Sequence, residues 1–273
     1  MNHVAPRVRL VVPTTGQRLG YLEKCLESIR EQGESVEIFI VGCAAAATLL
    51  QEVADTFGAQ FLVERGRGIS EAVNQGWEGA RTEYVGWLGD DDLLAAGGVH
   101  AAAEQLDRNP AVAMVYGRVG VIDAQGNHIF TMRPGRFASW LVRYGQNFVW
   151  QPGSLYRRTA VRRVGMLDPS LRYAMDFDLH LRLRQQGGLS YVPQVLACFR
   201  AHPDSLTMSN PNPNDEPKMV MRRHLEPMES SLEPLWWPLV RCIGRVWGVA
   251  QYRTGRTRYM SRMLETSCPL ERR

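Results

Sequence analysis

The feature that most constrains the fold of this chain is a short apolar segment that runs into three consecutive acids. Residues 84–88 are aromatic, aliphatic or glycine, which is typical of a strand covered on both faces. Asp90, Asp91 and Asp92 follow after one glycine. Ligands of open α/β sheets bind beyond the carboxyl ends of the strands. Three adjacent carboxylates repel one another unless a cation lies among them, and Mg²⁺ prefers such oxygen ligands. The alternative interpretation is a solvated acidic turn in which Asp91 or Asp92 caps the next helix.

The first ninety residues alternate apolar runs with helical patterns. Strands are predicted from Arg9, at residues 36–41, at residues 60–63 and from Tyr84. Between them, helices are predicted over residues 22–30, 44–57 and 69–79, the second with Leu49, Leu50, Val53 and Phe57 inside. This alternation predicts βαβ units and a parallel sheet.

The second half of the chain has a less regular pattern. It predicts a helix to Leu106, strands at 111–116, 154–157 and 190–199, a hairpin of 119–123 with 128–132, and helices at 159–164 and 176–186. The aromatic segment between Arg133 and Gly153 is expected to cover the site.

Composition excludes several classes of protein. The net charge is +4, and residues 215–273 hold eleven Lys/Arg and seven Asp/Glu, so the first 214 residues are neutral. This argues against a nucleic-acid binder. The five cysteines are scattered without metal-ligand spacing, which indicates a reducing, cytoplasmic compartment. We expect no signal peptide, and no transmembrane helix because no apolar run reaches about 18 residues.

Six motifs occur in an order that resembles one known family. They are Val12-Pro13-Thr14, Gly68-Ile69-Ser70-Glu71-Ala72-Val73-Asn74-Gln75-Gly76, Gly86-Trp87-Leu88-Gly89-Asp90-Asp91-Asp92, Gln151-Pro152-Gly153-Ser154-Leu155-Tyr156-Arg157-Arg158, Tyr173-Ala174-Met175-Asp176-Phe177-Asp178-Leu179-His180-Leu181-Arg182-Leu183 and Phe199-Arg200-Ala201-His202-Pro203-Asp204-Ser205. Together they resemble family-2-type inverting nucleotide-sugar glycosyltransferases.

The resemblance implies a GT-A fold, an α/β Rossmann-like mixed sheet with helices on both faces. The catalytic domain is predicted to span residues 1–209. A C-terminal helical extension is predicted over residues 210–273, after a polar, Pro-rich linker at residues 210–214.

The same resemblance implies an enzyme of the hexosyltransferase class that uses a nucleoside diphosphate sugar and Mn²⁺ or Mg²⁺. Asp92 is the expected metal ligand, and His202 is expected to complete the metal or diphosphate site. Asp90 and Asp91 would contact the ribose or hold waters around the metal. The acceptor is expected to be a hydroxyl on a glycan or a lipid-linked molecule, in surface polysaccharide synthesis.

The resemblance also implies a general base. Asp176 is expected to take the proton of the acceptor hydroxyl. Asp178 lies two residues further on, so it points to a different face of the helix, where it can pair with Arg182 four residues on.

Other positions are expected to contact the nucleotide sugar or the acceptor. Pro13, Thr14, Glu64, Arg67, Gly68 and Gln151 are the predicted binding residues, and Arg157 is a weaker candidate. At the end of the second strand the chain departs from the family, because Gly42-Cys43 replaces the usual aspartate. The identity of the base in the donor is therefore left open.

The tail is predicted to form a basic amphipathic helix. Leu239, Ile243, Val246, Trp247 and Ala250 share its expected apolar face. Residues 235–262 would meet an anionic membrane surface on the inner face of the cell membrane, or pack on the catalytic domain or on a second subunit of a homo-oligomer.

Two other functions fit part of the sequence. A nucleotidyltransferase also places acids on an α/β sheet, but it would need a Gly-rich, basic loop after the first strand, and Pro13-Thr14-Thr15-Gly16 is not such a loop. A non-catalytic partner in an assembly complex would explain Gly42-Cys43, whereas the presence of both Asp92 and Asp176 argues for an enzyme.

Overall fold

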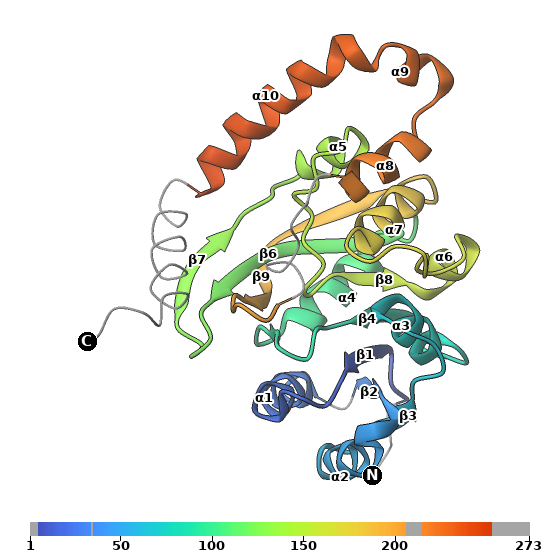
Figure 1. The fold of residues 1–273 in the computed structure, drawn as a ribbon, viewed down its shortest axis with the longest axis vertical. Helices are drawn as coiled ribbons and strands as arrows, with labels where there is room; N and C mark the ends of the chain where they lie inside the picture. Colours follow the sequence, from blue (N-terminus) through green and yellow to red (C-terminus); the bar gives the residue numbers. More distant parts are fainter. Residues whose placement is uncertain (1–4, 34, 206–214, 253–273) are drawn as a thin grey trace.

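The structure, a computed structural model, describes residues 5–33, 35–205 and 215–252. Its strands are β1 (Val8–Thr14), β2 (Val36–Gly42), β3 (Gln60–Val63), β4 (Tyr84–Trp87), β5 (Leu93–Leu94), β6 (Met114–Ile122), β7 (His128–Met132), β8 (Leu155–Arg157) and β9 (Leu189–Arg200). Within these residues they form one nine-stranded sheet in the order β3-β2-β1-β4-β8-β6-β9-β5, with β7 paired to β6 (Figure 1).

The helices surround this sheet (Figure 1). They are α1 (Leu19–Arg30), the 3₁₀ turn η1 (Ala44–Ala46), α2 (Ala47–Phe57), α3 (Ile69–Trp77), α4 (Gly98–Arg108), α5 (Ala138–Arg143), α6 (Arg158–Arg163), α7 (Met175–Arg184), α8 (Asp215–Arg223), α9 (Pro227–Ser231) and α10 (Glu233–Tyr252).

The first half of the sheet is parallel and the second half is mixed. β1 pairs in parallel with both β2 and β4, and β2 pairs in parallel with β3. β8 is antiparallel to β4 and β6, whereas β6 and β9 are parallel. The predicted mixed α/β sheet with helices on both faces is therefore confirmed.

Alternating side chains of the central strands divide the core into two layers. Val11 and Val85 point into a layer that α3, α5, α6, α7 and α8 cover. Leu10 and Val12 point the other way, into a layer that α1, α2 and α4 cover. Strands buried on both faces explain the continuous apolar runs of the sequence. The parallel pairing of β1 with β4 also places the ends of these two strands side by side, where the acids follow.

The chain after the acids differs from the prediction. Leu93 and Leu94 form β5, which is antiparallel to β9, and α4 begins only at Gly98 after the left-handed Gly97. Asp91 and Asp92 therefore do not cap the next helix, and pairing of β5 with β9 holds them at the sheet edge instead.

Two other predictions from periodicity were wrong. The strands expected at 111–116 and 119–123 are one strand, β6, which runs on through Gly117. Glycine fits at this position because a Cβ would lie only 2.5 Å from the side chain of Leu196. Leu49 on α2 is exposed rather than buried, and Leu50 and Val53 form the inner face of that helix.

The C-terminal helices pack on the rest of the fold, and α10 does so through only part of the predicted face, because Ile243 and Trp247 are half-buried and Trp247 contacts Phe137. Val220 and Met221 of α8 are fully buried in the same core layer as α7. On α10, Val240 is buried while Leu239 and Val246 are exposed. Half-buried Trp236 and Trp237 take their place against the core, because burying indole rings removes more apolar surface from water.

Parts of the predicted tail lie outside the described residues. These are the linker at residues 210–214 and the arginines at 253, 256, 258 and 262. Among the helices that the structure describes, none combines the length and the apolar character needed to cross a bilayer.

Candidate active site

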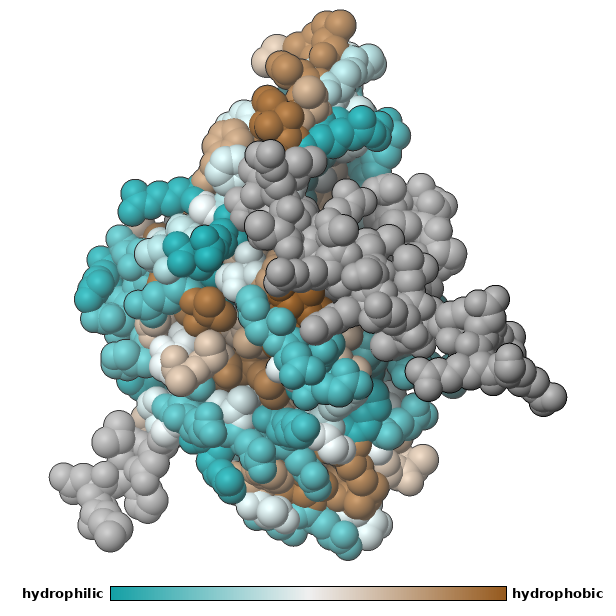
Figure 2. Space-filling model, turned by 90° about the vertical axis from the view of Figure 1, so that its left-hand side faces the viewer, coloured by the Kyte–Doolittle hydropathy of each residue, from teal (hydrophilic) through white to brown (hydrophobic). Residues whose placement is uncertain are grey.

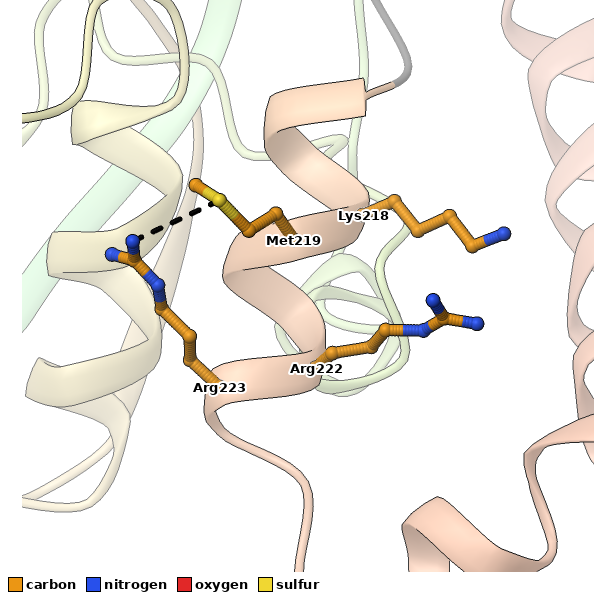
Figure 3. A pocket seen from close by; sticks show the side chains of 4 residues that line it. All are labelled: Lys218, Met219, Arg222 and Arg223. Atoms are coloured by element: carbon orange, nitrogen blue, oxygen red, sulfur yellow. Dashed lines mark hydrogen bonds between the residues drawn. The ribbon is translucent and has the colours of Figure 1, made fainter.

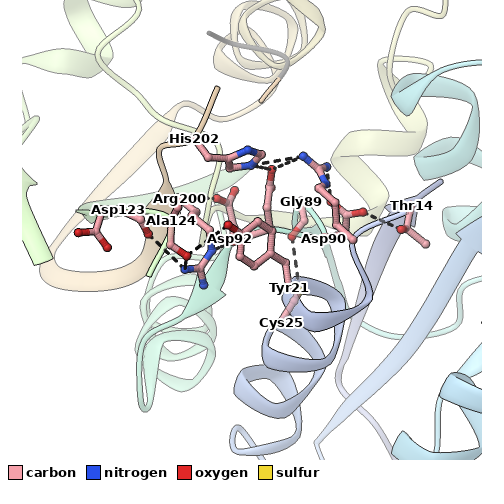
Figure 4. A network of polar contacts seen from close by, with 12 residues as sticks. Thr14, Tyr21, Cys25, Gly89, Asp90, Asp92, Asp123, Ala124, Arg200 and His202 are labelled. Atoms are coloured by element: carbon pink, nitrogen blue, oxygen red, sulfur yellow. Dashed lines mark hydrogen bonds and ion pairs between the residues drawn. The ribbon is translucent and has the colours of Figure 1, made fainter. Parts of the chain in front are cut away.

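The three acids lie in a loop at the carboxyl end of β4, residues 89–92, which we call the acid loop. Asp90 and Asp92 are almost fully buried. Thr14 Oγ1, at the end of β1, donates a hydrogen bond to Asp90 Oδ2 at 2.6 Å, and Arg18 Nη2 donates to Asp90 Oδ1 at 2.6 Å (Figure 4). Burial raises the pKa of Asp90, and these two hydrogen bonds oppose that rise.

Arg18 and His202 meet the second acid. Arg18 Nη1 lies 3.2 Å from Asp91 Oδ2 and 3.3 Å from His202 Nε2. His202 Nε2 lies 2.8 Å from the same oxygen of Asp91, and the imidazole is buried. The structure thus brings His202 to the acid loop from the turn after β9, although its imidazole contacts Asp91 and not Asp92.

Arg200, the last residue of β9, fixes the backbone around the acids. Its N–H donates to Asp92 Oδ1 at 2.9 Å, and its Nε donates to the carbonyl oxygen of Asp91 at 2.8 Å. Its Nη1 reaches two carbonyl oxygens of the β6–β7 turn, and its guanidinium lies 4.6 Å from the ring centre of Tyr21 (Figure 4). Arg200 therefore ties the acid loop to β9, α1 and the β6–β7 hairpin.

Two oxygens of the acid loop accept nothing from the described residues. Asp91 Oδ1 and Asp92 Oδ2 have no hydrogen-bond or ion-pair partner there, whereas both oxygens of Asp90 are occupied. A Cβ on Gly89 would lie 2.8 Å from Asp91 Oδ1 and 3.3 Å from Asp92 Oδ2, so both oxygens face the same point. Burial, and then the charge of Asp91, raise the pKa of Asp92 well above its ordinary value.

This donor set fits a hard divalent cation. Carboxylate oxygens with an imidazole nearby are suitable ligands for Mn²⁺ or Mg²⁺. The arrangement is not a closed cage, since no group of three or more His, Cys, Asp or Glu among the described residues is positioned to hold a metal. Here the guanidinium of Arg18 supplies positive charge to Asp90 and Asp91 instead.

Asp176 lies in the first turn of α7 and has an unusual environment. Burial raises its pKa to about 6, while the N–H of Phe177 and the side chain of Asn147 hydrogen-bond to it and oppose that rise. Its charge in turn adds to the effect of burial in raising the pKa of Tyr156, whose ring stacks on Trp87 at the end of β4 with centroids 5.5 Å apart. A carboxyl group poised near neutral pH is suited to move a proton.

Asp178 has a different role. Its carboxylate binds Arg182 on the same helix at 2.6 Å and His224 at 2.9 Å. Burial opposes ionisation, but these two partners hold the pKa of Asp178 below its usual value. The pairing with Arg182 that the sequence allowed is observed, and a carboxylate so occupied is not available as a base.

The predicted nucleotide residues lie in two loops beyond β1 and β3. Pro13 and Thr14 end β1, whereas Glu64, Arg67 and Gly68 precede α3. Gly68 has φ +91°, a conformation that favours glycine. Arg67 is exposed and makes no hydrogen bond or ion pair with the described residues, whereas nearby Arg65 is paired with Glu78.

Close packing explains the departure at the end of β2. A Cβ on Gly42 would clash with the end of the Leu50 side chain and would lie 3.0 Å from the carbonyl oxygen of Thr14, so a larger residue here would require Leu50 and the end of β1 to shift. Cys43 is half-buried, and its Sγ lies 3.3 Å from the carbonyl oxygen of Thr15. The β1–α1 loop and the segment after β2 are thus in direct contact where the family usually has an acid.

The two remaining candidates differ in their surroundings. Gln151 Nε2 donates to the carbonyl oxygen of Trp87 at 2.6 Å, which places Gln151 beside the strand that leads to the acid loop. Arg157 instead binds three carbonyl oxygens at the end of α4 and in the loop after it. Its guanidinium is used within the fold, so the geometry favours a structural role for Arg157 over a ligand contact.

A shallow pocket on α8 is not part of this site. Its lining residues are Lys218, Met219, Arg222 and Arg223 (Figure 3). Arg222 is paired with Glu233 and Arg223 with Asp168. The pocket therefore contains none of the predicted site residues, and two of its cations are already used within the fold.

Sequence reasoning missed Arg18, Tyr21 and Glu216. Arg18 belongs to no motif, and only the surplus of three acids indicated that some cation had to meet them. Glu216 of α8 accepts hydrogen bonds from the backbone N–H groups of residues 172–174 and so holds the turn that leads to Asp176. A contact between residues more than forty positions apart leaves no signal in a local pattern.

We predict that Asp178→Asn destabilises the fold, because it leaves Arg182 and His224 without their anion. The free energy of unfolding should fall by about 3 kcal/mol in urea titrations at neutral pH. Folding lowers the pKa of Asp178. The ionised carboxylate therefore stabilises the fold above the pKa that Asp178 has in the unfolded chain, and this stabilisation is lost as the pH falls through its pKa in the folded protein. The wild type should therefore lose more stability on acidification than the variant.

The matched control for this prediction is Asp176→Asn on the same helix. Removing a carboxylate whose pKa is raised by burial should leave the stability unchanged or increase it. Equal losses of stability in the two variants would contradict the different roles assigned to these two acids.

Comparison with known proteins agrees with the geometry. The profile of glycosyl transferase family 2 matches residues 10–165, more than half of the chain. A glycosyltransferase of Rickettsia typhi is 22% identical over 226 residues, which cover 79% of this chain and 70% of that protein. The O-antigen biosynthesis protein RfbC of Myxococcus xanthus is 27% identical over 190 residues, which cover 66% of this chain but only 14% of RfbC.

Solved structures share the fold at low identity. TarS 1–349 of S. aureus, in complex with UDP-GlcNAc, superposes with a TM-score of 0.62 and 13% identity over 94% of this chain and 92% of that one. The mannosyltransferase PcManGT of Pyrobaculum calidifontis, in complex with GDP-Man and Mn²⁺, superposes with a TM-score of 0.58 and 18% identity. The superposition covers 97% of this chain and 80% of that one. The GT-A fold expected from the sequence is confirmed, and the family match favours sugar transfer over nucleotidyl transfer. The chain belongs to glycosyl transferase family 2 and is a glycosyltransferase.

Proposed function

We propose that this glycosyltransferase is metal-dependent and inverting, and that it moves one sugar from a nucleoside diphosphate sugar to a hydroxyl of a glycan or lipid-linked acceptor. The observation that carries the proposal is the acid loop. Its Asp91 Oδ1 and Asp92 Oδ2 have no partners among the described residues, although they lie at the carboxyl end of β4 and close to Arg18, Arg200 and His202.

Asp92 would hold the metal, with His202 and Asp91 beside it. A bound Mn²⁺ or Mg²⁺ would neutralise the diphosphate leaving group as a Lewis acid. The complex of PcManGT with GDP-Man and Mn²⁺ supports a metal in a protein of this fold. The complexes of TarS with UDP and UDP-GlcNAc support a nucleotide sugar as donor.

Arg18 would contribute to donor binding. Its side chain is 30% exposed and is attached at the start of α1, so its guanidinium can turn from Asp90 and Asp91 towards an incoming diphosphate. Guanidinium groups bind phosphate oxygens through two parallel hydrogen bonds. Thr14 and Pro13 would line the same end of the sheet, while Glu64, Arg67 and Gly68 would contact the nucleotide from the loop before α3.

Asp176 would act as the general base. It accepts the proton of the acceptor hydroxyl while that oxygen attacks the anomeric carbon and the bond from this carbon to the diphosphate oxygen breaks. A single displacement of this kind inverts the configuration at the anomeric carbon. Gln151, next to Trp87, would contact the acceptor or the donor sugar between Asp176 and the acid loop.

The biological setting is proposed to be surface polysaccharide synthesis in the cytoplasm, at the inner face of the cell membrane. The name of RfbC, an O-antigen biosynthesis protein, supports this setting.

We predict that Asp92→Asn and Asp176→Asn each lower kcat by about a hundredfold or more, because one removes a metal ligand and the other the base. Release of the nucleoside diphosphate in the presence of acceptor measures turnover. Asp55→Asn, on the exposed side of α2, is the matched control and should keep full activity. Turnover at the wild-type level in both site variants would favour a non-catalytic partner in an assembly complex.

We further predict that kcat/KM depends on an ionisation near pH 6. Asp176 must be deprotonated to act as base, and its pKa is about 6. The rate should therefore be constant above this pH and fall about tenfold per unit below it. Initial rates at a fixed, saturating metal concentration measure the profile; a rate that stays constant down to about pH 4 would exclude Asp176 as the base.

A further inference from the structure

We propose that one face of α10 docks on an anionic lipid surface and thereby sets the acceptor side of the active site at the membrane. This inference rests on the proposed lipid-linked acceptor and identifies the partner of that function. It assigns the contact to a face of α10 that keeps Leu239 and Val246 of the face expected from the sequence, whereas Trp247 of that expected face contacts Phe137.

The proposed face is a continuous apolar stripe. It consists of Leu232, just before the helix, and Leu235, Leu239, Cys242 and Val246 on it; we call it the α10 stripe. The spacing alternates between three and four residues, which keeps all of these side chains on one side of a helix. Its aliphatic side chains are between 46% and 77% exposed. Figure 2 shows apolar side chains at the top of the molecule, where α9 and the start of α10 lie.

The charges that flank the stripe on the described part of α10 are positive. Arg241 and Arg245, on the same helix, are exposed, and Arg245 is the nearer of the two to the stripe. The sequence has six arginines and no Asp or Glu between Pro234 and Leu264. An amphipathic helix with an apolar stripe and basic neighbours fits the boundary between headgroups and acyl chains of an anionic bilayer.

The opposite face of α10 holds the helix on the domain. The ring of Trp247 contacts that of Phe137, and the ring of Trp236 contacts that of Tyr144. Gly244 packs so closely on Gln146 that a Cβ at this position would clash with it. The tryptophans therefore face the protein, and the α10 stripe is left for another partner.

The same contacts connect α10 to the proposed base. Arg143, at the end of α5, forms an ion pair with Glu229 of α9. Asn147, four residues further on, hydrogen-bonds to Asp176 through its side chain. The segment of residues 137–147 thus lies between the helix that would touch lipid and the carboxylate that would meet the acceptor. A docked α10 would present a lipid-linked hydroxyl on the Asp176 side of the site.

A second copy of the chain is the competing occupant, and the charges favour lipid over it. Pairing two α10 stripes side by side would bring Arg245 of each copy to the border of the interface, and the exposed residues of the described α10 include no acid to pair with it. An anionic bilayer supplies the missing negative charge, and each arginine near such a surface adds to the attraction.

The test is flotation of the full-length protein with lipid vesicles. One set contains equal parts of phosphatidylglycerol and phosphatidylcholine, and the other contains phosphatidylcholine alone. We expect the wild type to float with the anionic vesicles and much less with the neutral ones. Leu235→Glu combined with Leu239→Glu should lower the bound fraction at least about tenfold, because two lipid-buried leucines are lost. Leu49→Glu, an exposed leucine on α2, is the matched control and should bind like the wild type.

Two results would overturn the proposal. One is equal flotation of the wild type and the double variant. The other is a wild-type dimer in vesicle-free buffer that Leu235→Glu converts to a monomer, which would assign the α10 stripe to a second copy. Donor hydrolysis without acceptor, measured on the same samples, separates this inference from the proposed function. It should be unchanged in the double variant, whereas its absence in the wild type would count against the proposed function alone.

Discussion

Three adjacent carboxylates, two of them buried, can be held in this fold only because donors from separate segments meet them at one point. Thr14 and Arg18 come from β1 and the start of α1, whereas Arg200 and His202 come from the end of β9 and the turn after it. Without them the mutual repulsion of the acids and the loss of hydration would both oppose folding. The cost is not fully offset, since the pKa of Asp92 stays well above its ordinary value. The proposed metal would supply the positive charge that the buried carboxylate of Asp92 lacks.

The same sheet separates the proposed metal chemistry from the proposed base chemistry. Asp92 follows β4, whereas Asp176 lies in the first turn of α7; Trp87 of β4 stacks on Tyr156, whose pKa the charge of Asp176 helps to raise. Asp176 and Asp178 are two residues apart, yet folding shifts their pKa values in opposite directions, because Asp178 has the cationic partners Arg182 and His224 whereas burial dominates at Asp176. Position on the helix, and not residue type, therefore separates the proposed base from a structural acid.

Much of the fold followed from local pattern, and most of the site did not. The first four strands and the helices between them were predicted because strands buried on both faces are continuously apolar. Asp92 and Asp176 could be selected by their motifs, whereas their neighbours Arg18 and Asn147 are ordinary polar residues in unpatterned loops. On α10 only part of the expected apolar face packs on the domain, since Trp247 contacts Phe137 while Leu239 and Val246 are exposed, and helical periodicity does not reveal which apolar side chains turn inward. Trp236 and Trp237 decided that choice through tertiary packing.

The most direct test of the central claim is calorimetric titration of the protein with UDP, GDP, dTDP and CDP, each with and without Mn²⁺. The account predicts that one nucleotide binds tightly, and only when the metal is present, because the acid loop and the diphosphate must share the cation. That result would also identify the donor class. If no nucleotide binds to the folded protein, with or without Mn²⁺, the acid loop is not a metal–diphosphate site and the account is contradicted.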